Sequence, residues 1–292
     1  MDYLVAQDLI RSERLDLVRE GGLRGFAPFE TPCDPTAEPL VRLSPAEPLT
    51  ADDFAGYREL DRFEFDEAIA DCRFGRYDGG YLFTMTAPGQ PPVLFAKADG
   101  DPLVRSNVAA AGRPDPSLLR FGLWMLVGIA HNPHSVAIHS SVIVRDGRAV
   151  LFLGESGTGK STHTRLWREH IAGARLLNDD SPIVRIVAGT PTVFGSPWSG
   201  KTPCYRNESY PIAAFVRLTQ APRNRIERLP VLQAIGALLS SCPPAFAYDA
   251  TLQDNICNTL SQAIARVPVY RLECLPDADA ARLSFETTLQ AR

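Results

Sequence analysis

The sequence lacks the features that mark membrane and secreted proteins. Its longest apolar stretch runs only from Phe121 to Ala130, whereas a membrane-spanning helix needs about 20 apolar residues. The acidic N-terminal segment, with Asp2 and Asp8, does not have the charged-then-apolar order of a signal peptide. We therefore expect a cytoplasmic protein with no membrane partner.

Closely spaced cysteines and an excess of basic residues are also missing. The six cysteines are scattered, and no pair has the C-x-x-C spacing that a zinc or dithiol site favours, so we expect reduced thiols. Lys and Arg total 30 against 34 Asp and Glu, which gives a net charge of −4. Without a long basic run to hold a phosphate backbone, we expect no nucleic-acid partner.

The size and composition are those of a globular protein. A chain of 292 residues is long enough for two domains, and 45% hydrophobic with 22% charged residues argues against disorder. Residues 1–115 read as short strands separated by Pro and Gly turns, with no carboxylate pair or histidine cluster that compels a catalytic role. From Pro116 the pattern becomes a buried helix over residues 117–130. We therefore predict a β-rich N-terminal unit at 1–115 and a second domain at 116–292.

The most informative stretch of the second domain has the pattern G-x-x-x-x-G-K-[ST]. It follows the apolar run Val150–Leu153 and precedes a helix-like run at 162–171. Its glycines allow backbone N–H groups to approach phosphate oxygens, Lys160 reaches the β- and γ-phosphates, and the Ser161 hydroxyl is a ligand for Mg²⁺. The predicted ATP- and Mg²⁺-binding residues are Gly154, Glu155, Ser156, Gly157, Thr158, Gly159, Lys160, Ser161 and Thr162.

A hairpin precedes this loop. Asp146-Gly147 between two apolar runs is a strong turn signal, so the strand that carries His139 is predicted to pair with the strand that leads to Gly154. His139 is then either a hydrogen-bonded core histidine or part of the site beside the loop.

Two adjacent carboxylates follow about twenty residues after the loop. Asp179 and Asp180 end a short predicted strand at 174–177, which is where phosphate-loop sites place a Mg²⁺ ligand and a base. The alternative is a plain Asp-Asp-Ser-Pro turn. The spacing of one strand–loop–helix–strand unit favours the functional interpretation.

A third stretch, residues 194–206, contains two cations. Lys201 and Arg206 are candidates to neutralise charge on a transferring phosphoryl group, and the alternative is a surface loop whose Trp198 packs on the core. Further along, predicted strands at 212–218 and 269–273 alternate with predicted helices at 229–241 and 252–267. This alternation indicates an α/β architecture.

Taken together, these motifs resemble the HPr kinase/phosphorylase catalytic domain and its wider relatives with the phosphoenolpyruvate carboxykinase-like nucleotide-binding fold. The matching segments, in the order that the family uses, are 139–144, 154–161 and 177–180. The resemblance implies an α/β, HPr kinase-like P-loop domain after the smaller β-rich unit. It implies that Lys160 and Ser161 hold the phosphates and Mg²⁺, that one of Asp179 and Asp180 is a metal ligand and the other the catalytic base, and that His139 lies beside that base.

The sequence also departs from this family. The Glu-Ile-Arg-Gly segment of true HPr kinases is missing, and residues 195–203 stand in its place, so the resemblance does not extend to HPr as the substrate. Compared with the carboxykinases the chain is too short, and Ser181 stands where their acidic run continues.

We therefore predict an ATP- and Mg²⁺-dependent kinase that transfers the γ-phosphoryl group to a hydroxyl of a protein serine or a small molecule. The alternatives are a non-catalytic nucleotide-binding regulatory protein and a phosphate-driven phosphorylase of the same family. The acceptor and the separate roles of Asp179 and Asp180 stay open, and a homo-oligomer is compatible with the sequence.

Overall fold

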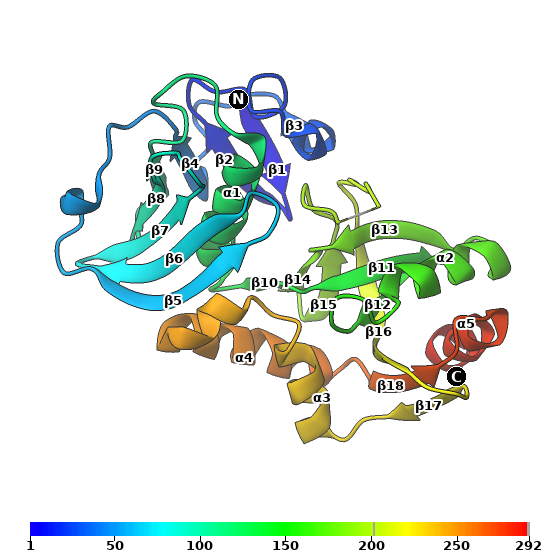
Figure 1. Cartoon of the computed structure of the whole chain (residues 1–292). Helices are drawn as coiled ribbons and strands as arrows, with labels where there is room; N and C mark the ends of the chain where they lie inside the picture. Colours follow the sequence, from blue (N-terminus) through cyan, green and yellow to red (C-terminus); the bar gives the residue numbers. More distant parts are fainter. Residues whose placement is uncertain (201, 291–292) are drawn as a thin grey trace. The chain divides into compact units, whose positions relative to one another are not determined.

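Two nine-stranded sheets organise the part of the chain that the computed structural model describes, residues 1–200 and 202–290 (Figure 1). Each sheet belongs to its own unit. Unit 1 comprises Met1–Asn132 and Ala245–Leu252, and unit 2 comprises Pro133–Pro244 and Gln253–Arg292. The first crossing between units lies after Asn132 rather than at the predicted boundary after residue 115. That residues 116–292 form the nucleotide-binding catalytic domain stays a prediction.

The sheet of unit 1 is mostly antiparallel. In spatial order its strands are β3 (Glu30–Thr31), β1 (Asp2–Val5), β2 (Asp8–Ser12), β4 (Val41–Ser44), β9 (Leu103–Ser106), β8 (Val93–Ala98), β7 (Gly80–Thr86), β6 (Ala70–Tyr77) and β5 (Arg58–Phe65). The pairs β2–β4 and β4–β9 are parallel. Short 3₁₀ turns at Arg24–Phe29 and Ala51–Asp53 connect the strands.

The predicted helix after residue 116 is α1 (Pro116–His131), and it packs on this sheet. Asp115 caps it by accepting hydrogen bonds from the backbone N–H groups of Ser117 and Leu118. At Gly122 a Cβ atom would lie 2.2 Å from the Phe95 ring, so the absence of a side chain lets the helix approach β8. This close packing places α1 with unit 1.

The sheet of unit 2 contains the motifs. One path through it runs β10 (Ser135–Ala137), β14 (Ile183–Val187), β15 (Thr190–Phe194), β16 (Ser209–Gln220), β12 (Arg148–Leu153), β11 (Ser140–Arg145) and β13 (Arg175–Asp180), while β18 (Val269–Cys274) pairs with β16 and with β17 (Arg225–Arg228). β12 and β18 are parallel to β16. β11 is antiparallel to both β12 and β13. The carboxyl ends of β12, β13, β16 and β18 therefore meet at one edge.

The predicted hairpin is confirmed. Asp146 and Gly147 both have positive φ, 49° and 71°, and they join β11 to β12 as the two central residues of a type I′ turn. The prediction that His139 lies within the strand was wrong. His139 falls in the gap between β10 and β11, because its backbone N–H donates to the Ser241 carbonyl at 2.7 Å instead of joining the ladder.

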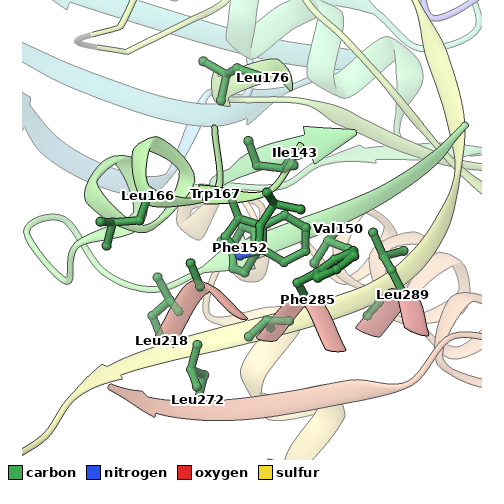
Figure 2. Packing of buried hydrophobic residues seen from close by; sticks show 14 residues of the cluster. Ile143, Val150, Phe152, Leu166, Trp167, Leu176, Leu218, Leu272, Phe285 and Leu289 are labelled. Atoms are coloured by element: carbon green, nitrogen blue, oxygen red, sulfur yellow. The ribbon is translucent and has the colours of Figure 1, made fainter. Parts of the chain in front are cut away.

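Helices α2 (Lys160–His170) and α5 (Ala278–Phe285) share an apolar core with the central strands (Figure 2). Phe152 from β12, Trp167 from α2 and Phe285 from α5 meet edge to face. The C-terminal end of α5 continues as a π-helical turn, Glu286–Gln290. The other helical segments are α3 (Val231–Leu239), a 3₁₀ turn at Pro244–Tyr248 and α4 (Ala250–Ile264). None of the helices in the described residues is long and apolar enough to cross a membrane.

A buried histidine joins α2 to α5 within this core. The His163 Nε2 atom lies 3.0 Å from Ser284 Oγ, and Trp167 Nε1 donates to the same oxygen at 2.8 Å. Ser284 in turn donates to the Ala281 carbonyl at 3.0 Å. Trp167 Nε1 also lies 3.3 Å from His163 Nε2, so the indole N–H is shared between the ring nitrogen and the hydroxyl. Burial lowers the pKa of His163 to about 4, because the apolar surroundings disfavour the imidazolium ion.

This shift predicts a stability that falls in mild acid. Between pH 6.5 and about 4 the unfolded chain binds a proton at residue 163 that the folded chain does not, so the free energy of unfolding decreases over this window by about 3 kcal/mol. Below it the contribution is constant. Urea denaturation of the wild type and of His163→Gln from pH 4 to 7.5 measures the effect as a difference in slope. Equal slopes in the two proteins would contradict it.

Candidate functional site

The glycine-rich loop after β12 adopts a conformation that side chains would hinder. Gly154, Gly157 and Gly159 have φ values of 149°, 83° and 101°. At Gly154 a Cβ would also lie 2.4 Å from Thr158 Oγ1, which itself donates to the Glu155 carbonyl at 2.8 Å. Gly159 is the N-cap of α2 and offers no side chain to the first N–H groups of the helix. Those groups and the helix dipole make this end of α2 suited to an anion.

Lys160 is 8% exposed, and its ammonium group lies against the loop backbone. It donates to the carbonyls of Gly154 at 2.6 Å and Glu155 at 3.0 Å, and its third partner is His139 Nε2 at 2.9 Å. Burial lowers the pKa of Lys160, and the nearby carboxylates of Asp180 and Asp179 oppose part of that shift. With these three contacts, every N–H donor of the charged ammonium group has an acceptor.

His139 connects this lysine to the acidic doublet. Its Nδ1 lies 3.1 Å from Asp180 Oδ1, while its Nε2 faces Lys160. Because the ammonium group can only donate, Nε2 acts as acceptor and Nδ1 carries the proton toward the carboxylate. The result is a continuous hydrogen-bonded chain from Asp180 through His139 to Lys160.

The other carboxylate pairs with the residue after the lysine. The Ser161 hydroxyl lies 3.2 and 3.3 Å from the two carboxylate oxygens of Asp179. Asp179 is 5% exposed, whereas the side chain of Asp180 is 37% exposed. The two adjacent aspartates thus occupy different environments, one closed and one open to solvent.

The backbone beneath the doublet is irregular. The pairing of β11 with β13 shifts register between Val142 and Ile143, and Asp180 has φ of 140°, a conformation that side chains rarely adopt. Residues 196–200 hold this end of β13 in place. Gly200 N–H donates to the Asp179 carbonyl at 2.6 Å, and the Asn178 side-chain amide donates to the Trp198 carbonyl at 3.0 Å.

The remaining predicted loop residues lie around this centre. Thr162 is half-buried in the first turn of α2, and Ser156 is exposed at the tip of the loop. The Glu155 side chain is also exposed and lies 3.7 Å from Arg217. Of the two predicted cations, the structure describes only Arg206. Arg206 has Glu208 as an ion-pair partner at 3.7 Å, and Lys201 lies outside the described residues.

Sequence reasoning missed two residues at the carboxyl end of β16. Arg217 donates to Ser240 Oγ at 2.7 Å and to the Ala237 carbonyl at 3.4 Å, and its positive charge further lowers the pKa of Lys160. Gln220 donates from its side-chain amide to the Gly157 carbonyl at 3.2 Å. An arginine within the apolar run 212–218 was a detectable signal, because charge inside a buried strand needs a partner. Gln220 carried no such signal.

Close packing of Gly195 against the Arg206 backbone gives a test of how firmly this region is held. A Cβ at Gly195 would lie 2.0 Å from the Arg206 carbonyl oxygen, so Gly195→Ala should lower the free energy of unfolding by about 1–3 kcal/mol. The control is Gly236→Ala at an exposed position of α3, where nothing lies within 4 Å of the added Cβ. It should raise the free energy of unfolding by about 0.5–1 kcal/mol. Equal stability of the two variants in chemical denaturation would show that the segment yields freely.

Comparison with known proteins adds little to this geometry. No protein-family model and no curated protein matches the chain. Among solved structures, the chain is similar to an HPr(Ser) kinase/phosphatase from Coxiella burnetii, with 15% sequence identity and a TM-score of 0.30 over 53% of this chain and 88% of that one. At this level of similarity the functional argument rests on the residues of the site.

Proposed function

We propose that this protein is an ATP- and Mg²⁺-dependent phosphotransferase that moves the γ-phosphoryl group to a hydroxyl. The observation that carries the proposal is the meeting of three features at one sheet edge. These are the glycine loop at the start of α2, the pair Ser161–Asp179 and the chain Asp180–His139–Lys160.

The loop supplies the groups that bind phosphates. The first N–H groups of α2 have no side-chain cap, and Lys160 is the first residue of the same helix, so both bring positive charge to the loop. A bound triphosphate offers oxygens that replace the loop carbonyls as partners of Lys160. Arg217, which is near enough to affect the Lys160 pKa, adds a second positive charge.

Ser161 and Asp179 fit a magnesium ion. Mg²⁺ is usually held by one or two protein oxygens together with water and substrate phosphates, and a serine hydroxyl beside a carboxylate matches this pattern. Among residues 1–200 and 202–290 no group of three or more His, Cys, Asp and Glu side chains is arranged for a metal ion, which suits a metal bound mainly through the nucleotide. When bound, Mg²⁺ neutralises charge on the transferring phosphoryl group.

Asp180 is the proposed base. Its carboxylate is the more exposed of the two and is oriented by His139, which makes His139 a positioning residue. The acceptor oxygen forms a bond to the γ-phosphorus while the bond from that phosphorus to the β–γ bridging oxygen breaks. The electron pair leaves with ADP, and the hydroxyl proton goes to Asp180.

Replacement of the aspartates should separate binding from transfer. In the Asp179→Asn, Asp180→Asn double variant the loop is intact, so ATP still binds, whereas transfer falls by about 10²-fold or more because the base is lost. Asp179→Asn alone should raise the Mg²⁺ concentration at half-maximal rate. Asp180→Asn alone should lower the rate without that shift. The measurements are ATP titration and transfer of labelled γ-phosphate to components of a cell extract or to water.

Lys160→Met is the control that should lose ATP binding as well. Wild-type rates in the double variant would contradict the roles of both aspartates. A wild-type protein that binds ATP but labels nothing and releases no phosphate would instead favour the regulatory nucleotide-binding alternative. Removal of a phosphoryl group only in the presence of inorganic phosphate would favour the phosphorylase.

A further inference from the structure

A cavity of about 610 Å³ opens beside the glycine loop, on the opposite side from the aspartates. Gly157, Gly159 and Thr162 line one wall, and the residues that follow β16 and β18 line the other. Because β12 lies between β16 and β11, with β13 beyond β11, the strand order places the loop between this cavity and the doublet. A ligand whose phosphates lie on the loop with the terminal one toward Asp180 must extend its other end toward the cavity.

The far wall is apolar and built from two turns. Pro222 follows β16, and Leu275 and Pro276 follow β18. Leu275 is 40% exposed, so part of its apolar surface is open to solvent. A flat heteroaromatic ring is the kind of group that such a surface covers well.

Hydrogen bonds join the two turns to each other and to their neighbours. Ala221 N–H donates to the Cys274 carbonyl at 3.2 Å, which joins the turns directly. Asn224 accepts from Leu275 N–H at 2.8 Å and donates to the Asp277 carboxylate at 2.9 Å. The wall is therefore preformed, so little ordering is required when it is occupied.

One side chain joins this wall to the phosphate loop. Gln220, which also lines the cavity, donates from Nε2 to the Gly157 carbonyl at 3.2 Å. Gly157 is the loop residue with φ of 83°. The cavity wall and the phosphate-binding loop are thus one connected structure.

We infer that this cavity holds the nucleoside part of the nucleotide. It does so by apolar packing rather than by hydrogen bonds that distinguish one base from another. The inference rests on the proposed function. The volume lies within the range of about 300–1,000 Å³ that small-molecule sites occupy. No Asp or Glu is among the described residues that line the cavity, so no carboxylate is present to pair with the N1–H and amino groups of guanine. ATP and GTP should therefore bind within about tenfold of each other, since a packing site discriminates weakly.

The test compares ATP with tripolyphosphate, which offers the phosphates without a nucleoside, both in the presence of Mg²⁺. In Ala221→Trp the indole fills the cavity, so ATP should bind at least about tenfold more weakly, while tripolyphosphate binding stays within about twofold of the wild type. Ala265→Trp, at an exposed position after α4, is the matched control and should change neither. Leu275→Ser trims the wall at a partly exposed position and should weaken ATP alone.

The outcomes separate this inference from the function on which it rests. Unchanged ATP affinity in both Ala221→Trp and Leu275→Ser, with folding verified by circular dichroism, would overturn the cavity assignment while leaving the phosphate loop intact. A GTP affinity hundredfold below that of ATP would overturn recognition by packing. A wild-type protein that binds neither ATP nor tripolyphosphate would overturn the proposed function itself.

Discussion

The arrangement of the site depends on the backbone hydrogen bonds that hold β12 between β16 and β11. The apolar residues of β12, Ala149–Leu153, are fully buried, and the strand pairs on both sides in a fixed register. That register places Ser140 opposite both Leu153 and Asp180, which brings the end of β13 to the start of the glycine loop. A slip of one residue would turn every buried side chain of β12 to the other face, so the core enforces the position of the loop.

The helix that begins at the loop is anchored at its other side. Trp167 and His163 reach the Ser284 hydroxyl in α5. Phe152 of β12 packs against Trp167 (Figure 2). These contacts fix how α2 points its N-terminus over the sheet edge. Groups that must hold a charged ligand are most effective when such packing has already oriented them, because no reorganisation is then needed.

Local patterns in the sequence were enough to predict the loop, the hairpin and the alternation of strands and helices. Asp146-Gly147 required positive φ at two successive residues, and the spacing from Lys160 to Asp179 measured one strand–loop–helix–strand unit. These predictions succeed because the structure at each of these positions is determined by residues close in the sequence. The same spacing predicted Asp179 and Asp180 as site residues, but it did not predict that one is buried and the other partly exposed.

Other features depend on residues far apart in the chain. The break before β11 arises because His139 N–H donates to Ser241, about a hundred residues away, and no local pattern announces that partner. Likewise β16 pairs with β15 near its start and with both β12 and β18 further along. The positions of Arg217 and Gln220 therefore follow from topology rather than from composition. The boundary after Asn132 depends on the packing of α1 against Phe95.

The lysine of the loop carries a further implication for selectivity among anions. Its ammonium group already donates to three acceptors in the folded chain. When a ligand oxygen replaces one of them, the free energy gained is only the difference between the new hydrogen bond and the old one. A lone phosphate or sulfate ion gains little from that exchange. In the proposed function a polyphosphate would contact the start of α2 and a metal as well, so that several such exchanges add up. If the loop binds phosphates as proposed, these internal hydrogen bonds of Lys160 would favour polyphosphates over small inorganic anions.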